Sequence, residues 1–590
     1  MKISKKRFLL FIILLLILPT VMAKQGRMVL LAVKETATGY TGSAADLYLE
    51  IKPGQGRVFM ETFPLSKMDT QISTRFAKEI ACNYLDKDCS RYDFFYTIKA
   101  KSAIIGGPSA GSALAVLTAA MLDGLEIDET IAITGTINSG GLIGPVSGLR
   151  AKIEAADEVN VSHVLIPKGE RFAKEDFNLT NKTLNLTTDL KDYGEKYGIE
   201  VSEVADLTEA LYIFTGKRFK EFDKKLEINK DYLDIMQILA RDLCDRTKDL
   251  HEQIAESRID VSLVDEDFIK LEESGINFSE RAERAFKDAR HYTSASYCYG
   301  ANVNYRRLLI RIQNFTDFNS VQKDIDEFKK KIIKAEIQTI TDLEAYMVVN
   351  ERLKDAEDSL KKAETNYEEG EDYIRDLARA IERIYSAKSW SFFFEMKNKE
   401  FDFSRENLEE SCVKKLAEAE ERYQYTRTFF PSALKETKKE LGYAYDDLES
   451  GDYELCLFKA SKAKAEVDVI LSVIGVDDEQ VDNLLANKLY IIKRILAEQQ
   501  EKGIFPILGY SYYEYANSLN KDDVYSALLY SEYALELSNL DLYFKEKKSR
   551  FADIHIDYKL IGIFAAGVVV GAILVLLIKR KKRIRRKKLF

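Results

Sequence analysis

Hydrophobic residues in the first third of the chain recur with two different periods. Residues 28–35 (MVLLAVKE) and 45–62 (ADLYLEIKPGQGRVFMET) alternate between apolar and polar positions, as strands with one buried face do. The Pro-Gly-Gln-Gly sequence at residues 53–56 predicts a turn that joins two strands into a hairpin. The same reasoning predicts further strands at 94–105, 131–137, 141–146 and 163–169, and helices at 74–84, 110–122 and 149–158. We therefore expect one compact α/β domain over residues 24–217.

Residues 218–558 follow a different pattern. Apolar residues recur at helical spacing over long stretches, and weak self-similarity surrounds small-residue turns near Gly300, Gly370, Gly451 and Asn520. We expect an irregular helical repeat or bundle that serves as a stalk and adaptor. A long coiled coil is the alternative, which the frequent turn residues disfavour. The tyrosines within residues 510–515 belong either to a binding face or, as we favour, to helix packing.

The N-terminus has the pattern of an export signal. Four basic residues precede an apolar run at residues 8–18, and small residues follow at positions 21–23. This order predicts a signal peptide over residues 1–23 that is cleaved after Ala23, and an uncleaved anchor is the alternative.

The C-terminus has the pattern of a membrane anchor. Residues 560–578 form an uncharged apolar run of 19 residues, which is long enough to cross a bilayer as a helix. Residues 579–588 are almost entirely basic, and such clusters stay in the cytoplasm. We expect a transmembrane helix at 559–578 and a basic cytoplasmic tail at 579–590. The chain would then be a single-pass protein of the cell membrane with residues 24–558 outside, and the lipid bilayer would be one of its partners.

Charge narrows the range of partners. The formal net charge of −9 includes both basic ends, so the chain between them is strongly acidic. Nucleic acid is therefore not an expected partner.

The cysteines and sequons fit an exported chain. Six cysteines allow fifteen pairings, among which we favour the sequential disulfides Cys82–Cys89, Cys244–Cys298 and Cys412–Cys456. For the last two pairs, free buried thiols are an equal alternative. N-x-S/T sequons, which are candidate glycosylation sites, begin at Asn160, Asn178, Asn181, Asn185, Asn277 and Asn314.

One serine and one lysine carry the candidate chemistry. Ser109 lies in GGPSAG, where a turn becomes a helix, so nearby N–H groups lack intrahelical partners and can stabilise an oxyanion. The small neighbours Gly107 and Ala110 let a substrate approach. Lys152, 43 residues downstream in GLRAK, becomes a general base if burial keeps its amine neutral. A capping serine and a solvated lysine are the plainer interpretations of each residue alone.

These segments resemble the proteolytic domain of Lon-type serine proteases. The resemblance extends from residue 52 to residue 217 and includes GPSAG, TGTINSGGLIGPVSGLRAKIEAA and HVLIPKGE. It implies a Ser109–Lys152 dyad, with Thr134 orienting the lysine amine, and homo-oligomeric rings by analogy. Gly106 is a departure, because many Lon proteases carry an acidic residue there.

The expected fold class is an α/β Lon-like proteolytic domain, then an all-α helical region, then a C-terminal transmembrane helix. No GxxxxGK[ST] phosphate loop occurs in the sequence, so we expect no ATPase in this chain. The cysteine spacings and the four histidines do not suit a zinc site, and we expect no cofactor or metal. The predicted function is a membrane-anchored, extracytoplasmic serine endopeptidase acting on peptides or unfolded proteins. A non-enzymatic surface scaffold and a self-processing protease are the alternatives.

Overall fold

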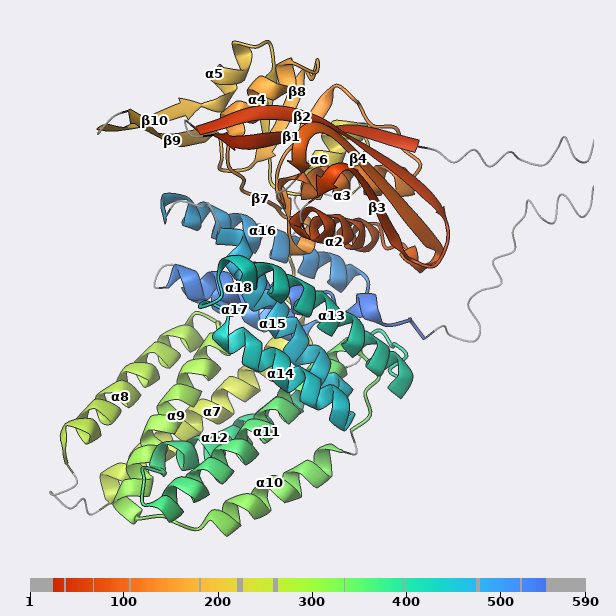
Figure 1. Ribbon diagram of the computed structural model, residues 1–590. Helices are drawn as coiled ribbons and strands as arrows, with labels where there is room; N and C mark the ends of the chain where they lie inside the picture. Colours follow the sequence, from red (N-terminus) through yellow and green to blue (C-terminus); the bar gives the residue numbers. More distant parts are fainter. Residues whose placement is uncertain are drawn as a thin grey trace, which may run out of the picture. The chain divides into compact units, whose positions relative to one another are not determined.

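The computed structural model describes residues 25–547 apart from short gaps (37–38, 67, 106–107, 180–181, 220–225, 258–263, 334, 395, 397, 474–477 and 520–522) (Figure 1). The predicted signal peptide, membrane span and basic tail fall on residues 1–23 and 559–590, which lie outside the described residues.

A mixed four-stranded sheet begins the α/β part. Its strands are β1 (Gln25–Thr36), β2 (Gly39–Pro53), β3 (Val58–Ser66) and β4 (Tyr92–Ile105), in the order β1-β2-β4-β3. The predicted hairpin between residues 45 and 62 is therefore wrong, because β4 lies between β2 and β3 and hydrogen-bonds to both. The turn is tied to β4 instead: Asp93 accepts hydrogen bonds from the backbone N–H groups of Gln55 (2.8 Å) and Arg57 (3.0 Å).

Strand β1 divides two hydrophobic cores. Met28 and Leu30 point into a core shared with β4 and the buried helix α3 (Gly111–Leu122), whereas Val29 and Leu31 pack in a second core. Successive side chains of a strand point to opposite sides of the sheet, so neighbouring residues of β1 enter different cores and both faces of the strand are buried. The alternation expected of residues 28–35 is therefore absent from residues 28–33, which form the continuous apolar run typical of a strand buried on both faces.

A smaller parallel sheet contributes to the second core. Its order is β11 (Glu200–Val204), β8 (His163–Pro167), β5 (Ile131–Ile133). Around the two sheets lie the remaining elements of the α/β part: α2 (Met68–Tyr84), β6 (Thr136–Ile137), β7 (Ile143–Gly144), α4 (Leu149–Asp157), β9 (Phe172–Leu179), β10 (Lys182–Asp189), α5 (Leu190–Glu195) and α6 (Leu207–Thr215).

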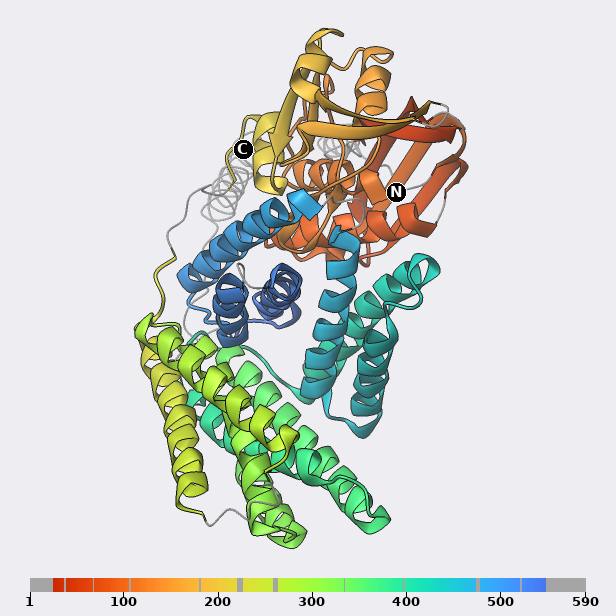
Figure 2. The same cartoon turned by 90° about the vertical axis from the view of Figure 1, so that its left-hand side faces the viewer.

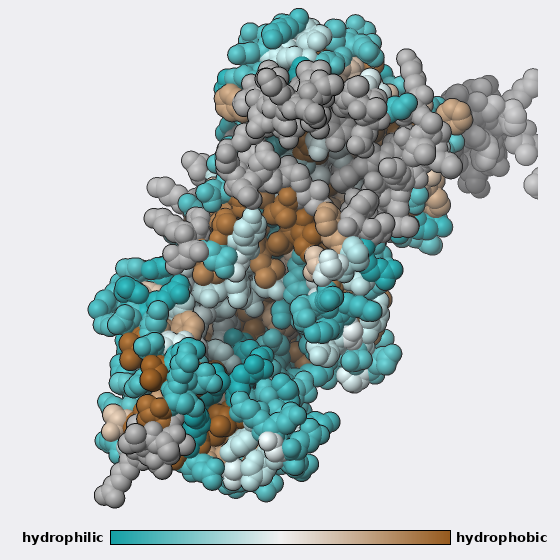
Figure 3. Space-filling model, turned by 60° about the vertical axis from the view of Figure 1, so that its left-hand side comes forward, coloured by the Kyte–Doolittle hydropathy of each residue, from teal (hydrophilic) through white to brown (hydrophobic). Residues whose placement is uncertain are grey.

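Helices make up the rest of the described chain, and the long ones lie side by side (Figure 2). They are α7 (Lys230–Glu256), α8 (Glu266–Lys287), α9 (His291–Gln313), α10 (Phe318–Ile332), α11 (Ile340–Glu369), α12 (Ile374–Trp390), α13 (Arg405–Phe429), α14 (Lys435–Ser450), α15 (Tyr453–Val473), α16 (Asp478–Glu501), α17 (Ile507–Leu519) and α18 (Val524–Leu537). The face drawn in Figure 3 is largely hydrophilic over these helices, with small groups of apolar side chains.

Two of the predicted turns lie at helix ends and one does not. Gly370 and Gly451 follow α11 and α14 in the left-handed conformation that favours glycine. Gly300 instead lies inside α9, where a Cβ would make an ordinary van der Waals contact of 3.4 Å with the Phe278 ring of α8. Asn520 lies outside the described residues.

The transmembrane helix of the expected fold class requires correction. Across the described stretches between residues 25 and 547, no helix combines the length and the apolarity that crossing a bilayer requires. Even the 30-residue α11 carries charged residues throughout its length. This finding overturns the single-pass location as well, and the segment on which both were based, residues 560–578, is outside the described residues.

The helical region packs against the α/β part through α16 and α18. Arg494 of α16 forms a buried ion pair with Asp206, the residue that caps α6. Gly140, in the loop after β6, lies so close to these helices that a Cβ would stand 2.8 Å from Ile495 and 3.1 Å from Leu535. Lys502 adds a more exposed ion pair with Asp86 at 2.9 Å.

Candidate active site

Ser109 lies in the short 3₁₀ segment η2 (Pro108–Ala110), directly before α3. Its side chain is half-buried, and Ala110 is the N-cap residue of α3. Helix α3 is buried over its first ten residues and begins with Gly111, where a Cβ would stand 3.0 Å from the backbone nitrogen of Ile137. Small residues therefore allow this helix start to approach the neighbouring strand. Gly107 and Gly106 are outside the described residues.

Gly135 fastens this segment to the end of β5. Its N–H donates to the carbonyl oxygen of Ser109 (3.0 Å), and its own carbonyl accepts from the N–H of Ser112 (3.1 Å). A Cβ on Gly135 would lie 2.5 Å from Cγ2 of Ile143 in β7. A larger residue at position 135 would therefore displace Ile143. The backbone of Ser109 is therefore hydrogen-bonded to Gly135, the residue that follows Thr134.

Lys152 approaches the same place from helix α4. The helix begins after Gly148, which has a left-handed conformation, and the Lys152 side chain is only 2% exposed. Its Nζ donates a hydrogen bond to Oγ1 of Thr134 over 3.0 Å. Burial lowers the pKa of the Lys152 amine to about 7, against the opposing effect of the Glu170 carboxylate. A large fraction of the amine is consequently neutral at neutral pH.

The structure thus brings Thr134 and Lys152 into direct contact and places Ser109 on the adjoining segment. Between Ser109 and Lys152, both of which are described, no hydrogen bond is present, and the connection runs through Gly135 and Thr134. A general base can acquire its hydrogen bond to the nucleophile only when substrate is bound.

Ser112 is a residue of the site that sequence reasoning missed. Its side chain is fully buried, and its hydroxyl has no hydrogen-bond partner among the described residues. The signal was present in GPSAGS, because serines three residues apart at a helix start lie on the same side of it.

Comparison with known proteins places this geometry in a family context. Residues 89–188, which include Ser109, Thr134 and Lys152, match the model of the Lon protease (S16) C-terminal proteolytic domain. This part of the chain is similar to Lon proteases. The resemblance inferred from the sequence is therefore confirmed, and it indicates a serine-type peptidase.

The alignments with individual relatives cover a limited part of each chain. A Lon protease of Paraburkholderia phytofirmans is 30% identical over 140 residues, which is 22% of this chain and 17% of that protein. A Lon protease of Methanosphaera stadtmanae is 29% identical over 139 residues, with the same coverage. An archaeal Lon protease of Thermoplasma volcanium is 26% identical over 148 residues, or 23% of this chain and 22% of that protein. The chain thus matches about a fifth of its relatives' length.

The other candidate residues lie away from the dyad or outside the description. The structure contains the disulfides Cys82–Cys89, Cys244–Cys298 and Cys412–Cys456. The sequon residues Asn160, Asn277 and Asn314 are exposed, whereas the side chains of Asn178, Asn181 and Asn185 fall outside the described set. In the part of the chain that the structure describes, no three His, Cys, Asp or Glu side chains are grouped as metal ligands.

Proposed function

We propose that the chain is a serine endopeptidase in which Ser109 is the nucleophile and Lys152 is the general base. The observation that carries this proposal is the buried amine of Lys152, hydrogen-bonded to Thr134 beside the residue that holds the backbone of Ser109. Burial supplies a neutral amine near pH 7 without any second base.

The chemistry would follow the acyl-enzyme route. Ser109 Oγ attacks the scissile carbonyl carbon while Lys152 takes the hydroxyl proton. The tetrahedral oxyanion is stabilised by backbone N–H groups beside Ser109 and by the positive end of the α3 dipole. The C–N bond then breaks, and the ammonium of Lys152 returns the proton to the leaving amine. Water, deprotonated by the same amine, hydrolyses the acyl ester and regenerates Ser109.

Thr134 would act as a positioning residue. Its hydroxyl accepts a hydrogen bond from one N–H of Lys152 Nζ, which leaves the lone pair of the neutral amine to accept the proton of the nucleophile. The residue is 1% exposed, so its rotamer is fixed by packing.

The proposed substrates are peptides and unfolded proteins, and hydrolysis would proceed without ATP bound to this chain. The support is the absence of a phosphate-loop motif from the sequence. A ring of subunits, expected by analogy with Lon proteases, would be detected by sedimentation velocity.

The test is hydrolysis of an unfolded protein by the purified chain, without ATP, beside the variants Ser109→Ala and Lys152→Ala. We expect cleavage by the wild type and none by either variant. Cleavage that persists in both variants would exclude the dyad. Intact wild-type protein with no turnover would favour a non-enzymatic scaffold. Loss of a chain segment only when Ser109 is present would favour self-processing.

A further inference from the structure

A cavity of about 440 Å³ lies beside the α/β part, between the start of β3, helix α2 and the helices α13 and α15. Its charged lining residues are basic more often than acidic: Arg57, Arg75, Lys78, Arg422 and Lys464 against Glu79, Glu418 and Glu421. Val58, Phe59 and Phe76 supply the apolar lining.

Three of the cations retain binding capacity. Within the described residues, Arg75 and Lys78 form no ion pair, although Lys78 is half-buried. Arg422 is only 7% exposed: its Nη1 lies 2.8 Å from Asp468 Oδ1, while its buried Nη2 has no hydrogen-bond partner in the described chain. Leaving a guanidinium N–H unsatisfied is unfavourable, so a ligand that accepts this hydrogen bond would be stabilised.

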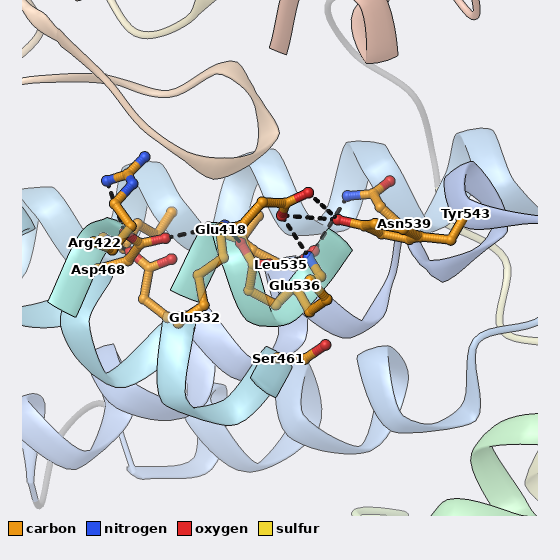
Figure 4. A network of polar contacts seen from close by, with 12 residues as sticks. Glu418, Arg422, Ser461, Asp468, Glu532, Leu535, Glu536, Asn539 and Tyr543 are labelled. Carbon is orange, nitrogen blue, oxygen red and sulfur yellow. Dashed lines mark hydrogen bonds and ion pairs between the residues drawn. The ribbon is translucent and has the colours of Figure 1, made fainter. Parts of the chain in front are cut away.

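The Arg422 guanidinium is held rigidly. Its centre lies 3.5 Å from the centroid of the Phe76 ring, and Asp468 fixes its other side. Figure 4 shows Arg422 and Asp468 at one end of a network of polar contacts that continues to Glu536, Glu418 and Tyr543. A planar, pre-oriented guanidinium is well suited to bind a carboxylate.

The negative charge of the acidic side chains in the cavity is reduced, either by neighbouring partners or by burial. Glu418 accepts a hydrogen bond from the Tyr543 hydroxyl (2.9 Å) and lies 3.2 Å from Lys415 Nζ. Burial, together with the nearby Glu418, raises the pKa of Glu79 to about 7, so its charge is incomplete at neutral pH. Burial also raises the pKa of Glu421. Burial lowers the pKa of the Lys78 amine as well, but Arg75 and the unsatisfied Nη2 of Arg422 remain cationic, so the cavity favours an anion.

The rim of the cavity fits a polypeptide better than a small inorganic ion. Strand β3 is an edge strand, paired with β4 on one side only. Phe59, on that strand, is 40% exposed and stacks on Phe95. Exposed backbone groups and an aromatic surface next to cations suit an extended chain that carries a carboxylate.

We propose that this cavity binds a carboxylate of a polypeptide, either an acidic side chain or the C-terminal carboxylate. As a specificity site for the peptidase, it depends on the proposed function. Helix α2 supports the link, because it lines the cavity and also contacts segment η2, which contains Ser109.

The test measures binding of labelled peptides to the full-length Ser109→Ala chain by fluorescence anisotropy. One unstructured decapeptide ends in Glu-Glu with a free C-terminus, a second has Gln-Gln with a free C-terminus, and a third has Gln-Gln with an amidated C-terminus. We expect the amidated Gln-Gln peptide to bind at least tenfold more weakly than the Glu-Glu peptide. The Gln-Gln peptide with a free C-terminus binds like the first peptide if the cavity recognises the C-terminal carboxylate, and like the third if it recognises acidic side chains. Arg75→Gln with Lys78→Met should weaken binding of the first peptide at least tenfold.

Lys34→Gln is the matched control, because Lys34 is an exposed cation on β1, at the opposite edge of the same sheet. It should leave the affinity unchanged. Equal affinities for all three peptides, an unchanged affinity in the double variant, or displacement by inorganic phosphate that binds as tightly as the peptide would each overturn the proposal. Because binding to the Ser109→Ala chain is measured without hydrolysis, a failure of this proposal can be distinguished from a failure of the proposed peptidase function.

Discussion

Arg494 and Asp206 form a buried ion pair across 288 residues of sequence, and Asp206 serves two structures at once. One of its carboxylate oxygens accepts the N–H groups of Thr208 (2.7 Å) and Glu209 (3.0 Å) at the start of α6. The other meets the Arg494 guanidinium of α16. The helical region is thereby joined to a helix end of the Lon-like part, near the loop that contains Gly140.

Removal of this ion pair should destabilise the whole described unit. Arg494→Met leaves the Asp206 charge buried without its partner, and such changes destabilise proteins by about 3 kcal/mol or more. Lys502→Met, one residue beyond the end of the same helix, is the control, because its ion pair with Asp86 is partly exposed and should contribute about 1 kcal/mol or less. Urea denaturation monitored by circular dichroism measures both, and equal losses would contradict the assigned role of Arg494.

The pH dependence of hydrolysis should report Lys152. The amine acts as a base only when neutral, and burial lowers its pKa to about 7. We expect kcat/KM to rise with pH through an inflection near 7 and then to reach a plateau. Stopped assays between pH 5.5 and 9 on a peptide without ionisable side chains measure this. A rate that falls as pH rises through 7 would exclude a neutral amine as the base.

The same residue should destabilise the fold at low pH. The folded-state pKa of Lys152 lies below its unfolded value of 10.5, so the unfolded chain binds more protons between the two values and stability increases as pH rises. Lys152→Met removes the buried charge and should raise the free energy of unfolding by roughly 1 to 3 kcal/mol at pH 6. The gain should shrink towards pH 9, and a gain independent of pH would contradict this explanation.

Thr134 should be needed for turnover more than for folding. Thr134→Val keeps the shape of the side chain but removes the acceptor of the Lys152 hydrogen bond. We expect kcat to fall about tenfold or more, in the usual range for a mispositioned general base, with KM little changed. Thr134→Ser should restore most of the rate. If valine and serine variants are equally active, Thr134 does not position the amine.

The sequence was sufficient to predict features that depend on neighbouring residues. The strand at β1, the helix start after Ser109 and the lysine of α4 each depend on neighbours within a few residues, and their patterns were visible. Likewise, the glycine and small residues near Ser109 indicated a closely packed helix start.

Apart from the sequential disulfides, the long-range pairings were not visible in the sequence. The turn at residues 53–56 has hairpin chemistry, but Asp93 and the rest of β4 compete for the same strand edges and separate β2 from β3. Gly300 has the composition of a turn, yet it lies inside α9, and this helix packs along α8. The contact between Arg494 and Asp206 likewise depends on the folded arrangement alone. In each case tertiary contacts override a local preference.

The most direct test of the dyad is covalent labelling by a fluorophosphonate probe, followed by peptide mass spectrometry. The account predicts an adduct on Ser109 in the wild-type chain, none in Ser109→Ala, and labelling slowed by at least 100-fold in Lys152→Met with the fold intact by circular dichroism. An unlabelled Ser109 in folded wild-type protein, or equal labelling in Lys152→Met, would contradict it.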